Sequence, residues 1–216
     1  LMVATLTGST DVQRLLDGNA DVNARDFDGA TALIWAARLG KADCAQLLIN
    51  AKAQIDVRDR IFGGTPLLWA AKRGRADCVQ LLIDVRAELE TKEIITCRTA
   101  LNWAASRGHA PCVEPLINAK ANINSKDNSH RTPLSGAVEC DHPDCVQLLI
   151  DAKASAKAKN GMNVLMLAAR DGHRECLAVL IDAKADIKAQ DNHGHTALML
   201  AAREGKLECV ELLADA

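Results

Sequence analysis

The sequence predicts an all-α solenoid of stacked helix-turn-helix repeats joined by β-hairpin-like fingers. Cysteine recurs at intervals of 34, 34, 33, 31 and 33 residues, a period typical of repeat architectures. The six positions in this column are Cys44, Cys78, Cys112, Cys145, Cys176 and Cys209. Aromatic residues make up only 2% of the 216 residues, so Ala, Leu, Ile, Val and Cys fill the core. Such residues suit thin, regular layers better than one thick centre.

A seven-residue motif that keeps step with the cysteine predicts the first helix of each repeat. It reads TALIWAA, TPLLWAA, TALNWAA, TPLSGAV, NVLMLAA and TALMLAA, from residues 31, 65, 99, 132, 163 and 196. Every copy opens with a side chain that can cap a helix N-terminus: Thr31, Thr65, Thr99, Thr132, Asn163 and Thr196. Pro66 and Pro133 follow at the first helical position, where a missing N–H costs nothing.

The second helix carries the cysteine and opens with an acid or a proline. These residues are Asp11, Asp43, Asp77, Pro111, Asp144, Glu175 and Glu208. An acid there complements the helix dipole, and a proline suits a first turn. Cys78, Leu81 and Leu82 share one helical face. One pair of helices is too small to bury that face alone, so neighbouring pairs have to stack.

This repeating unit resembles the ankyrin repeat, whose pattern is roughly D-x-x-G-x-T-P-L-H-x-A-A-x-x-G followed by a second helix ending in L-L. The likeness covers nearly the whole chain, with six copies in register and an N-terminal pair that lacks its leading finger. It implies one ankyrin repeat domain over residues 1–216. The approximate repeats are 1–22, 23–55, 56–89, 90–123, 124–156, 157–187 and 188–216.

The chain departs from the family pattern after the second helix, where the usual glycine is replaced by a basic residue. The replacements are Lys52, Arg86, Lys120, Lys153 and Lys184. We expect the left-handed turn to persist there, with positive φ at a cost of roughly 1 kcal/mol or more each.

The middle of the chain is expected to be the weakest part. Pro115 falls inside a second helix, where it should remove a backbone hydrogen bond and bend the helix. Gly136 stands where three earlier copies have tryptophan, and the finger before Asn163 is about two residues short. We therefore expect faster amide exchange over residues 108–160 than over residues 31–84.

The cysteine column is interpreted as packing rather than chemistry. Stacked helices lie about 8–10 Å apart, too far for disulfides between equivalent positions.

Cys97 and Cys140 lie outside the column, and Cys97 could be exposed and reactive. Cys140, His142 and Cys145 hint at a metal site, but Cys145 should point into the stack and a fourth ligand is missing. The sequence thus predicts no metal, no cofactor and no catalytic site.

Composition sets the expected class of partner and compartment. The net charge of −2 gives no strong attraction to nucleic acid or an acidic membrane. No apolar run approaches the roughly 18 residues needed to span a bilayer, and no secretory leader opens the sequence. Many cysteines without such a leader favour a reducing, intracellular location, with the cytoplasm as the expected one.

The finger tips are the first candidate contact surface. Phe27, Ile61, Phe62, Ile94 and Ile95 occupy three neighbouring tips, where the family usually has polar residues. The later tips are polar, with Asn128, Ser129, Asn160 and Asn192. Contiguous exposed apolar surface usually marks an interface. The alternative is that these side chains fold down onto each other as local packing.

A basic column at the end of the first helix is the second candidate surface. Arg38, Lys72, Arg73 and Arg107 should line the concave groove beside the apolar tips. The alternative is ordinary solvated charge. Trp35, Trp69 and Trp103 are interpreted mainly as core residues whose rims reach the groove. The implied partner is a protein with apolar anchors and acidic flanks.

The sequence therefore predicts a non-catalytic protein-interaction module. Two alternatives stay open. The chain could be a structural subunit or an inner segment of a larger assembly, since Leu1 falls inside a helix pair and LECVELLADA ends without an obvious polar cap. It could also be the ankyrin segment of a regulated enzyme, which would need a catalytic domain outside these residues.

Overall fold

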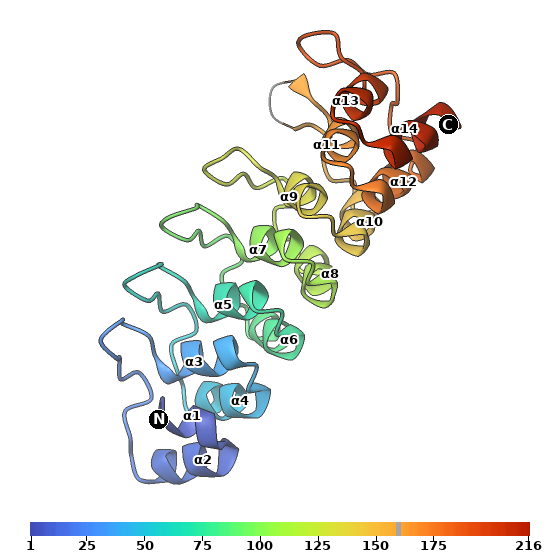
Figure 1. Cartoon of the computed structure of the whole chain (residues 1–216). Helices are drawn as coiled ribbons and strands as arrows, with labels where there is room; N and C mark the ends of the chain where they lie inside the picture. The colour runs from blue at the N-terminus through green and yellow to red at the C-terminus, as the bar shows by residue number, and fades with distance from the viewer. Residues whose placement is uncertain (159–160) are drawn as a thin grey trace.

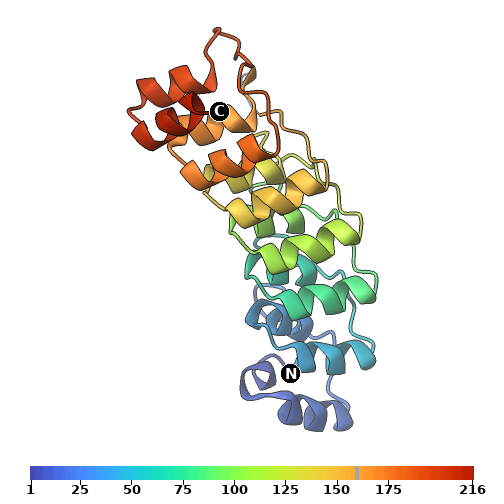
Figure 2. The same ribbon diagram turned by 90° about the vertical axis from the view of Figure 1, so that its right-hand side faces the viewer.

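The computed structural model describes residues 1–158 and 161–216, so the tip residue Asn160 lies outside the described residues. Fourteen α-helices lie within these ranges, and pairs of helices stack one upon the next (Figure 1). The fingers all project from the same side of the stack, and the chain termini lie at its opposite ends. Seen from the side, the second helices form one continuous row (Figure 2). The fold is thus the expected all-α solenoid.

The helices alternate between two layers. The first helices of the pairs are α1 (Ala4–Thr7), α3 (Ala32–Leu39), α5 (Pro66–Lys72), α7 (Ala100–Ser106), α9 (Pro133–Glu139), α11 (Val164–Asp171) and α13 (Ala197–Arg203). The second helices are α2 (Ser9–Asp17), α4 (Ala42–Asn50), α6 (Ala76–Asp84), α8 (Ala110–Asn118), α10 (Pro143–Asp151), α12 (Arg174–Asp182) and α14 (Leu207–Ala214). Within residues 1–158 and 161–216, no helix is long and apolar enough to cross a membrane.

All six predicted N-caps are confirmed. In each copy the side-chain oxygen of the capping residue accepts a hydrogen bond from the backbone N–H three residues later. In α7 and α9 the bond is reciprocal, because Asn102 and Ser135 accept from the backbone N–H of Thr99 and Thr132. These caps satisfy amide groups that the helix itself leaves unpaired.

The left-handed turns after the second helices are also confirmed. The five basic residues there have φ between 59° and 69°: Lys52, Arg86, Lys120, Lys153 and Lys184. Their backbone N–H groups still bond back to the helix, as Lys120 does to the carbonyl of Ile117 at 2.9 Å. The turn therefore keeps its geometry without the glycine that usually occupies it.

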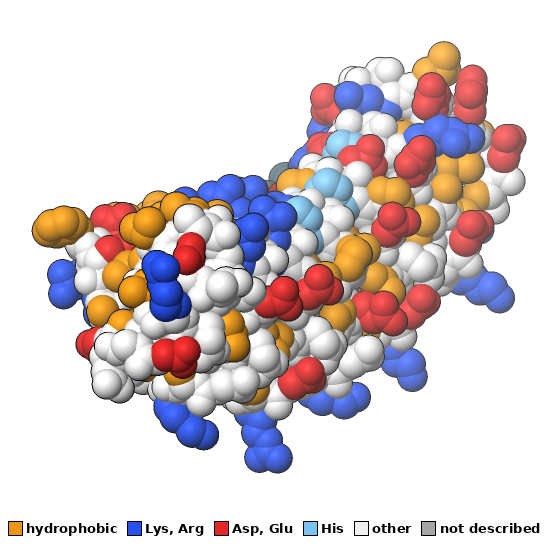
Figure 3. All heavy atoms as spheres, turned by 90° about the horizontal axis from the view of Figure 1, so that it is seen from below, with side chains coloured by type: hydrophobic (Ala, Val, Ile, Leu, Met, Phe, Trp, Pro, Cys, Tyr) orange, Lys and Arg blue, Asp and Glu red, His pale blue; other side chains and the backbone are white. Residues whose placement is uncertain are grey.

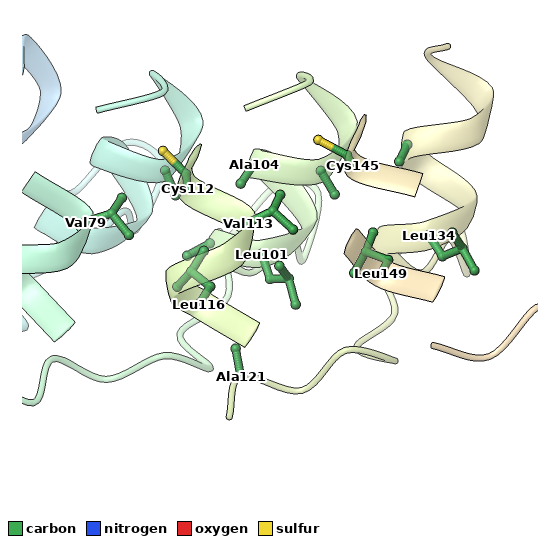
Figure 4. Packing of buried hydrophobic residues seen from close by; sticks show 14 of the residues in the cluster. Val79, Leu101, Ala104, Cys112, Val113, Leu116, Ala121, Leu134, Cys145 and Leu149 are labelled. Carbon is green, nitrogen blue, oxygen red and sulfur yellow. The ribbon is translucent and has the colours of Figure 1, made fainter. Parts of the chain in front are cut away.

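The core is one continuous layer of small apolar side chains between the helix pairs. Leu101, Val113 and Leu116 lie together in it, and Cys112 and Cys145 project into the layer from adjacent second helices (Figure 4). All six cysteines of the column are at most 2% exposed and carry free thiols. The packing interpretation of this column is confirmed, since free cysteine behaves as a small apolar residue.

Pro115 leaves the length of its helix unchanged. The helix α8 spans nine residues, as α4, α6 and α10 do, and continues through Pro115 to Asn118. A cleft of about 500 Å³ opens beside Pro115 on the outer surface, bounded by Ile83 and Asn118. Proline has no N–H to donate, so the helix runs on with one backbone bond fewer.

Candidate protein-interaction surface

Each of the first four fingers is a turn closed by an acidic residue at its base. The backbone N–H groups of Asp26, Asp59, Glu93 and Asp127 donate across the finger to the carbonyls of Ala30, Gly64, Arg98 and Arg131 at 3.0–3.1 Å. The carboxylate of Asp59 also accepts from the backbone N–H groups of Ile61, Phe62 and Gly64. An acid at this position therefore organises the turn that carries the tip residues.

Backbone hydrogen bonds join neighbouring fingers at their tips. The N–H of Arg60 donates to the carbonyl of Asp28 at 2.8 Å, and the N–H of Ile94 donates to the carbonyl of Phe62 at 2.8 Å. The N–H of Asn128 donates to Thr96 at 2.9 Å in the same way. The first four fingers are thus linked in series, and their tips form one supported edge of the molecule.

Four of the five predicted tip residues are exposed to solvent. Phe27 is fully exposed, and Ile61, Ile94 and Ile95 are each at least half exposed. Phe62 differs, because its ring packs edge-on against Trp69 with centroids 5.6 Å apart. The local-packing alternative therefore holds for Phe62, and the exposed apolar tips are those of the other four residues.

The tryptophans are held by the acids at the finger bases. The indole N–H groups of Trp35, Trp69 and Trp103 donate to the carboxylates of Asp26, Asp59 and Glu93 at 2.7–2.8 Å. Trp69 and Trp103 are buried, and Trp35 is half-buried. The predicted core role holds for the two later rings, and each ring also ties its helix to the finger that precedes it.

Basic side chains alternate with these rings. The guanidinium of Arg38 lies 5.1 Å from the centroid of Trp35 and 4.7 Å from that of Trp69. The ammonium of Lys72 follows, 5.0 Å from Trp69 and 4.0 Å from Trp103. The guanidinium of Arg107 lies 5.0 Å from the centroid of Trp103, which the finger residue Arg98 also contacts at 4.6 Å. We call this alternating column of three rings and three cations the cation–indole ladder; each contact of this kind contributes about 0.5–2 kcal/mol.

The prediction that Lys72 lines an open groove is wrong. Its side chain is only 12% exposed and pairs with Glu93 at 3.3 Å. Burial lowers the pKa of the Lys72 ammonium, and the nearby Glu93 carboxylate opposes that shift. Lys72 is enclosed because rings from two repeats and the finger acid of the next repeat converge on it, so it stabilises the ladder from within.

The three arginines of the predicted basic column have no ion-pair partner among the described residues. Arg73 and Arg107 are exposed and Arg38 is half-buried, and none of them forms an ion pair with a residue that the structure describes. In the later repeats, by contrast, basic residues at the helix ends are paired with neighbours, as Arg170 is with Asp171 and Arg203 with Glu204. Among these helix-end positions, the arginines without an ion pair therefore lie beside the first three fingers.

A surface view shows where apolar and basic side chains lie relative to the fingers. Figure 3 looks along the stack from its N-terminal end, with the fingers at the left. Hydrophobic side chains appear at the finger edge, and a group of Lys and Arg side chains lies beside them. Apolar and basic side chains thus adjoin on this face of the molecule.

The acids at the finger bases are the functional residues that the sequence reading missed. Each precedes its tryptophan by nine or ten residues, at Asp26, Asp59 and Glu93. That nearly regular spacing is visible in the sequence, and an indole N–H that is to be buried needs an acceptor. The fourth finger shows what happens without the ring: Asp127 instead holds Arg98 and Arg131, at 3.1 and 3.0 Å.

The residues considered for metal binding are not brought together. Cys145 is buried in the core and Cys140 is exposed at the end of α9. Among residues 1–158 and 161–216, no three His, Cys, Asp or Glu side chains are placed so that they could hold a metal ion. His109 packs over Gly74 of the preceding repeat, and His142 packs over Gly108 in the same way.

Comparison with known proteins agrees with this geometry. A family model described as ankyrin repeats (3 copies) matches residues 1–93, 67–160 and 142–216. The solved ankyrin repeat domain of human ASB11 superposes with a TM-score of 0.85 at 27% identity, over 98% of this chain and 96% of that one.

Two curated proteins share short segments with this chain. Serine/threonine-protein kinase 12 of Arabidopsis thaliana is 43% identical over 49 residues, which is 23% of this chain and 11% of the kinase. Cortactin-binding protein 2 of Dasypus novemcinctus is 52% identical over 40 residues, which is 18% of this chain and 2% of that protein. The matched segments thus span only a small part of these curated relatives. Since the family model and the solved structure both account for nearly the whole chain, it belongs to the ankyrin repeat family.

Proposed function

We propose that this chain is a non-catalytic module that binds a partner protein through its first three fingers and the adjoining concave surface. The observation that carries the proposal is the row of exposed apolar tips, Phe27, Ile61, Ile94 and Ile95, on fingers that are hydrogen-bonded in series. Ankyrin repeats generally act as protein-interaction modules, and an exposed apolar row of this kind marks an interface.

The partner is proposed to carry apolar anchors with acidic flanks. The anchors would contact the four tips, and the acids would pair with Arg38, Arg73 and Arg107, which form no ion pair among the described residues. Lys72 and Phe62 are proposed to support this surface from beneath, because they contact the rings of Trp69 and Trp103. Complementary charge of this type governs partner choice and association rate more than affinity.

The cytoplasm is the proposed location. The chain has eight free thiols, six of them packed as small apolar side chains, which suits a reducing compartment.

Affinity purification from the native source, followed by identification of the captured chains, tests the interaction. Replacing Phe27, Ile61, Ile94 and Ile95 by Ser should lower capture by at least about tenfold, because exposed apolar anchors dominate binding energy. Leu198 and Met199 are 40% and 53% exposed and lie on α13, so Leu198→Ser with Met199→Ser is the control and should capture normally. Far-UV circular dichroism should be unchanged in both variants, and undiminished capture by the tip variant would refute this surface.

A second candidate function is that of a subunit or inner segment of a larger assembly. It is favoured by Leu198, Met199 and Leu207, which expose apolar surface on the last helix pair. Light scattering of the isolated chain separates the two functions. Association that Met199→Glu abolishes supports the assembly, and a clean monomer supports the binding module.

A further inference from the structure

The third step of the cation–indole ladder shows a complete cation site. Lys72 from the preceding repeat lies 4.0 Å from the centroid of Trp103 and 3.3 Å from the Oε1 atom of Glu93. The Oε2 atom of Glu93 accepts the indole N–H of Trp103 at 2.8 Å and the Thr96 hydroxyl at 2.7 Å. Trp103 and Glu93, together with Phe62 and Trp69 of the previous repeat, therefore enclose a cation that the previous repeat supplies.

The first step has an equivalent ring and carboxylate in Trp35 and Asp26, but it lacks the cation, and Val3 stands where Trp69 does. Trp35 donates its indole N–H to Asp26 at 2.8 Å, as Trp103 does to Glu93. In register with LIWAARLG over residues 33–40, the segment LMVATLTG over residues 1–8 places Leu6 where Arg38 and Lys72 stand in the next repeats. Arg38 lies on the other side of Trp35, because it also contacts Trp69.

An open cleft takes the place of the missing cation. It has a volume of about 340 Å³ and is lined by Met2, Val3, Leu6, Asp26 and Trp35. Val3 is 74% exposed and Leu6 is 59% exposed, so the cleft is accessible from solvent. Its walls are apolar except for Asp26, whose carboxylate forms no ion pair with any described residue.

We propose that this cleft binds a lysine or arginine side chain of the partner protein. The aliphatic stem of that side chain would lie on Met2, Val3 and Leu6, and its charged end would meet the free face of Trp35 beside Asp26. Each Asp26 oxygen already accepts one N–H, from Ala30 and from Trp35, and a carboxylate oxygen can accept a second.

Asp59 keeps its carboxylate without an ion pair among the described residues, whereas Glu93 pairs with Lys72 at 3.3 Å; a basic occupant would give Asp26 the pairing seen at Glu93. The proposal rests on the proposed function only in taking the occupant from a protein partner. It adds an orientation: the basic residue of the partner binds at the N-terminal end of the surface, and its acidic flanks bind further along at Arg73 and Arg107.

The three indole N–H resonances in a ¹⁵N–¹H correlation spectrum test the site directly. They are assigned with Trp35→Phe and Trp69→Phe, and the protein is titrated with Nα-acetyl-lysine methylamide or with the neutral Nα-acetyl-norleucine methylamide. The Trp35 resonance should shift and saturate with the lysine derivative, at an apparent affinity at least about tenfold above that for norleucine. Trp69 and Trp103 each already contact a cation from the preceding repeat as well as one from their own, and they should not respond.

The variant Leu6→Lys supplies the cation from within the chain. It should abolish the response of Trp35 to the lysine derivative, whereas the neutral control Leu6→Met should retain it. Equal responses to lysine and norleucine would mean an apolar occupant, and a Trp35 shift caused by raising protein concentration alone would mean a second copy of the chain. Either result overturns the proposal, as would an unaltered response in Leu6→Lys.

The test separates this inference from the proposed function. The variant with serine at the four finger tips should keep the Trp35 response while losing the partner. A chain that captures its partner normally but shows no Trp35 response would refute the cation site alone.

Discussion

At the scale of single residues, the cysteine column shows how environment removes reactivity. Burial raises the pKa of Cys78 to about 11, that of Cys112 to about 11 and that of Cys145 to about 12. The thiolate is the reactive form, so these thiols stay protonated and inaccessible in the folded chain. Cys140 is exposed and Cys97 is partly exposed.

Thiol reactivity should therefore divide the eight cysteines into two classes. With Ellman's reagent at pH 8, we expect Cys140 and Cys97 to react quickly and the six column cysteines to react only as the protein unfolds. In strong denaturant all eight should react at once. A native protein in which a column cysteine reacts as fast as Cys140 would contradict the packing assignment.

The ion pair between Lys72 and Glu93 allows a second residue-scale prediction. Lys72→Met should lower the free energy of unfolding by about 3 kcal/mol, because it leaves the buried Glu93 carboxylate without its cation. The double variant Lys72→Met with Glu93→Gln keeps an acceptor for Trp103 and removes the unpaired charge. It should recover most of the loss in urea unfolding, and a double variant no more stable than the single one would argue against this origin.

Asp127 gives a prediction about pH. Burial alone would raise the pKa of its carboxyl, but hydrogen bonds from the Arg131 backbone and the Arg98 side chain outweigh that effect and lower the pKa. A lowered pKa in the folded state means that the stabilisation is present above the unfolded value of about 3.9 and is lost as pH falls through the folded one. Stability measured by urea unfolding should thus decline less steeply below pH ~4 in Asp127→Asn than in the parent chain.

At the scale of helices, short sequence motifs predicted most of the observed helix ends and buried faces. The N-caps at Thr31 and its equivalents and the left-handed turn at Lys52 and its equivalents are each set within a few residues, and all are confirmed. Burial of the cysteine face followed from helical periodicity, and it too is confirmed.

The contacts that were missed join a helix to a finger or to the neighbouring repeat. Lys72 is buried by Glu93 and Trp103, which lie in the next repeat. The half-burial of Phe62 depends on the conformation of its own finger against Trp69. Neither arrangement can be read from a single helix or finger, because each depends on a side chain that another element supplies.

Helix α8 carries the element-scale prediction. Hydrogen exchange followed by mass spectrometry should be faster over residues 108–160 than over residues 31–84, because Pro115 removes a helix bond and Gly136 replaces a ladder tryptophan. Pro115→Leu should restore the bond, raise stability by about 1–3 kcal/mol and slow exchange in α8. The neighbouring exposed change Glu114→Leu is the control and should do neither. Equal protection of the two regions would contradict the expected weakness.

At the scale of the whole molecule, each helix pair packs only against its neighbours. Equivalent positions therefore share an environment only when both neighbours are present. Met166 and Met199 occupy the same place, three residues after the capping residues Asn163 and Thr196. Met166 is 1% exposed, whereas Met199 is 53% exposed because no further pair packs over it in the described structure.

The same substitution at these two methionines tests whether the stability of a position depends on the neighbouring helix pairs. Met166→Gln should lower the free energy of unfolding by about 2–4 kcal/mol, because it buries an amide in an apolar layer. Met199→Gln should change it by less than about 0.5 kcal/mol, since water can solvate the amide. Urea unfolding followed by circular dichroism measures both. Similar losses at the two positions would mean that the face of α13 is already covered in solution, which would favour the larger assembly over the isolated binding module.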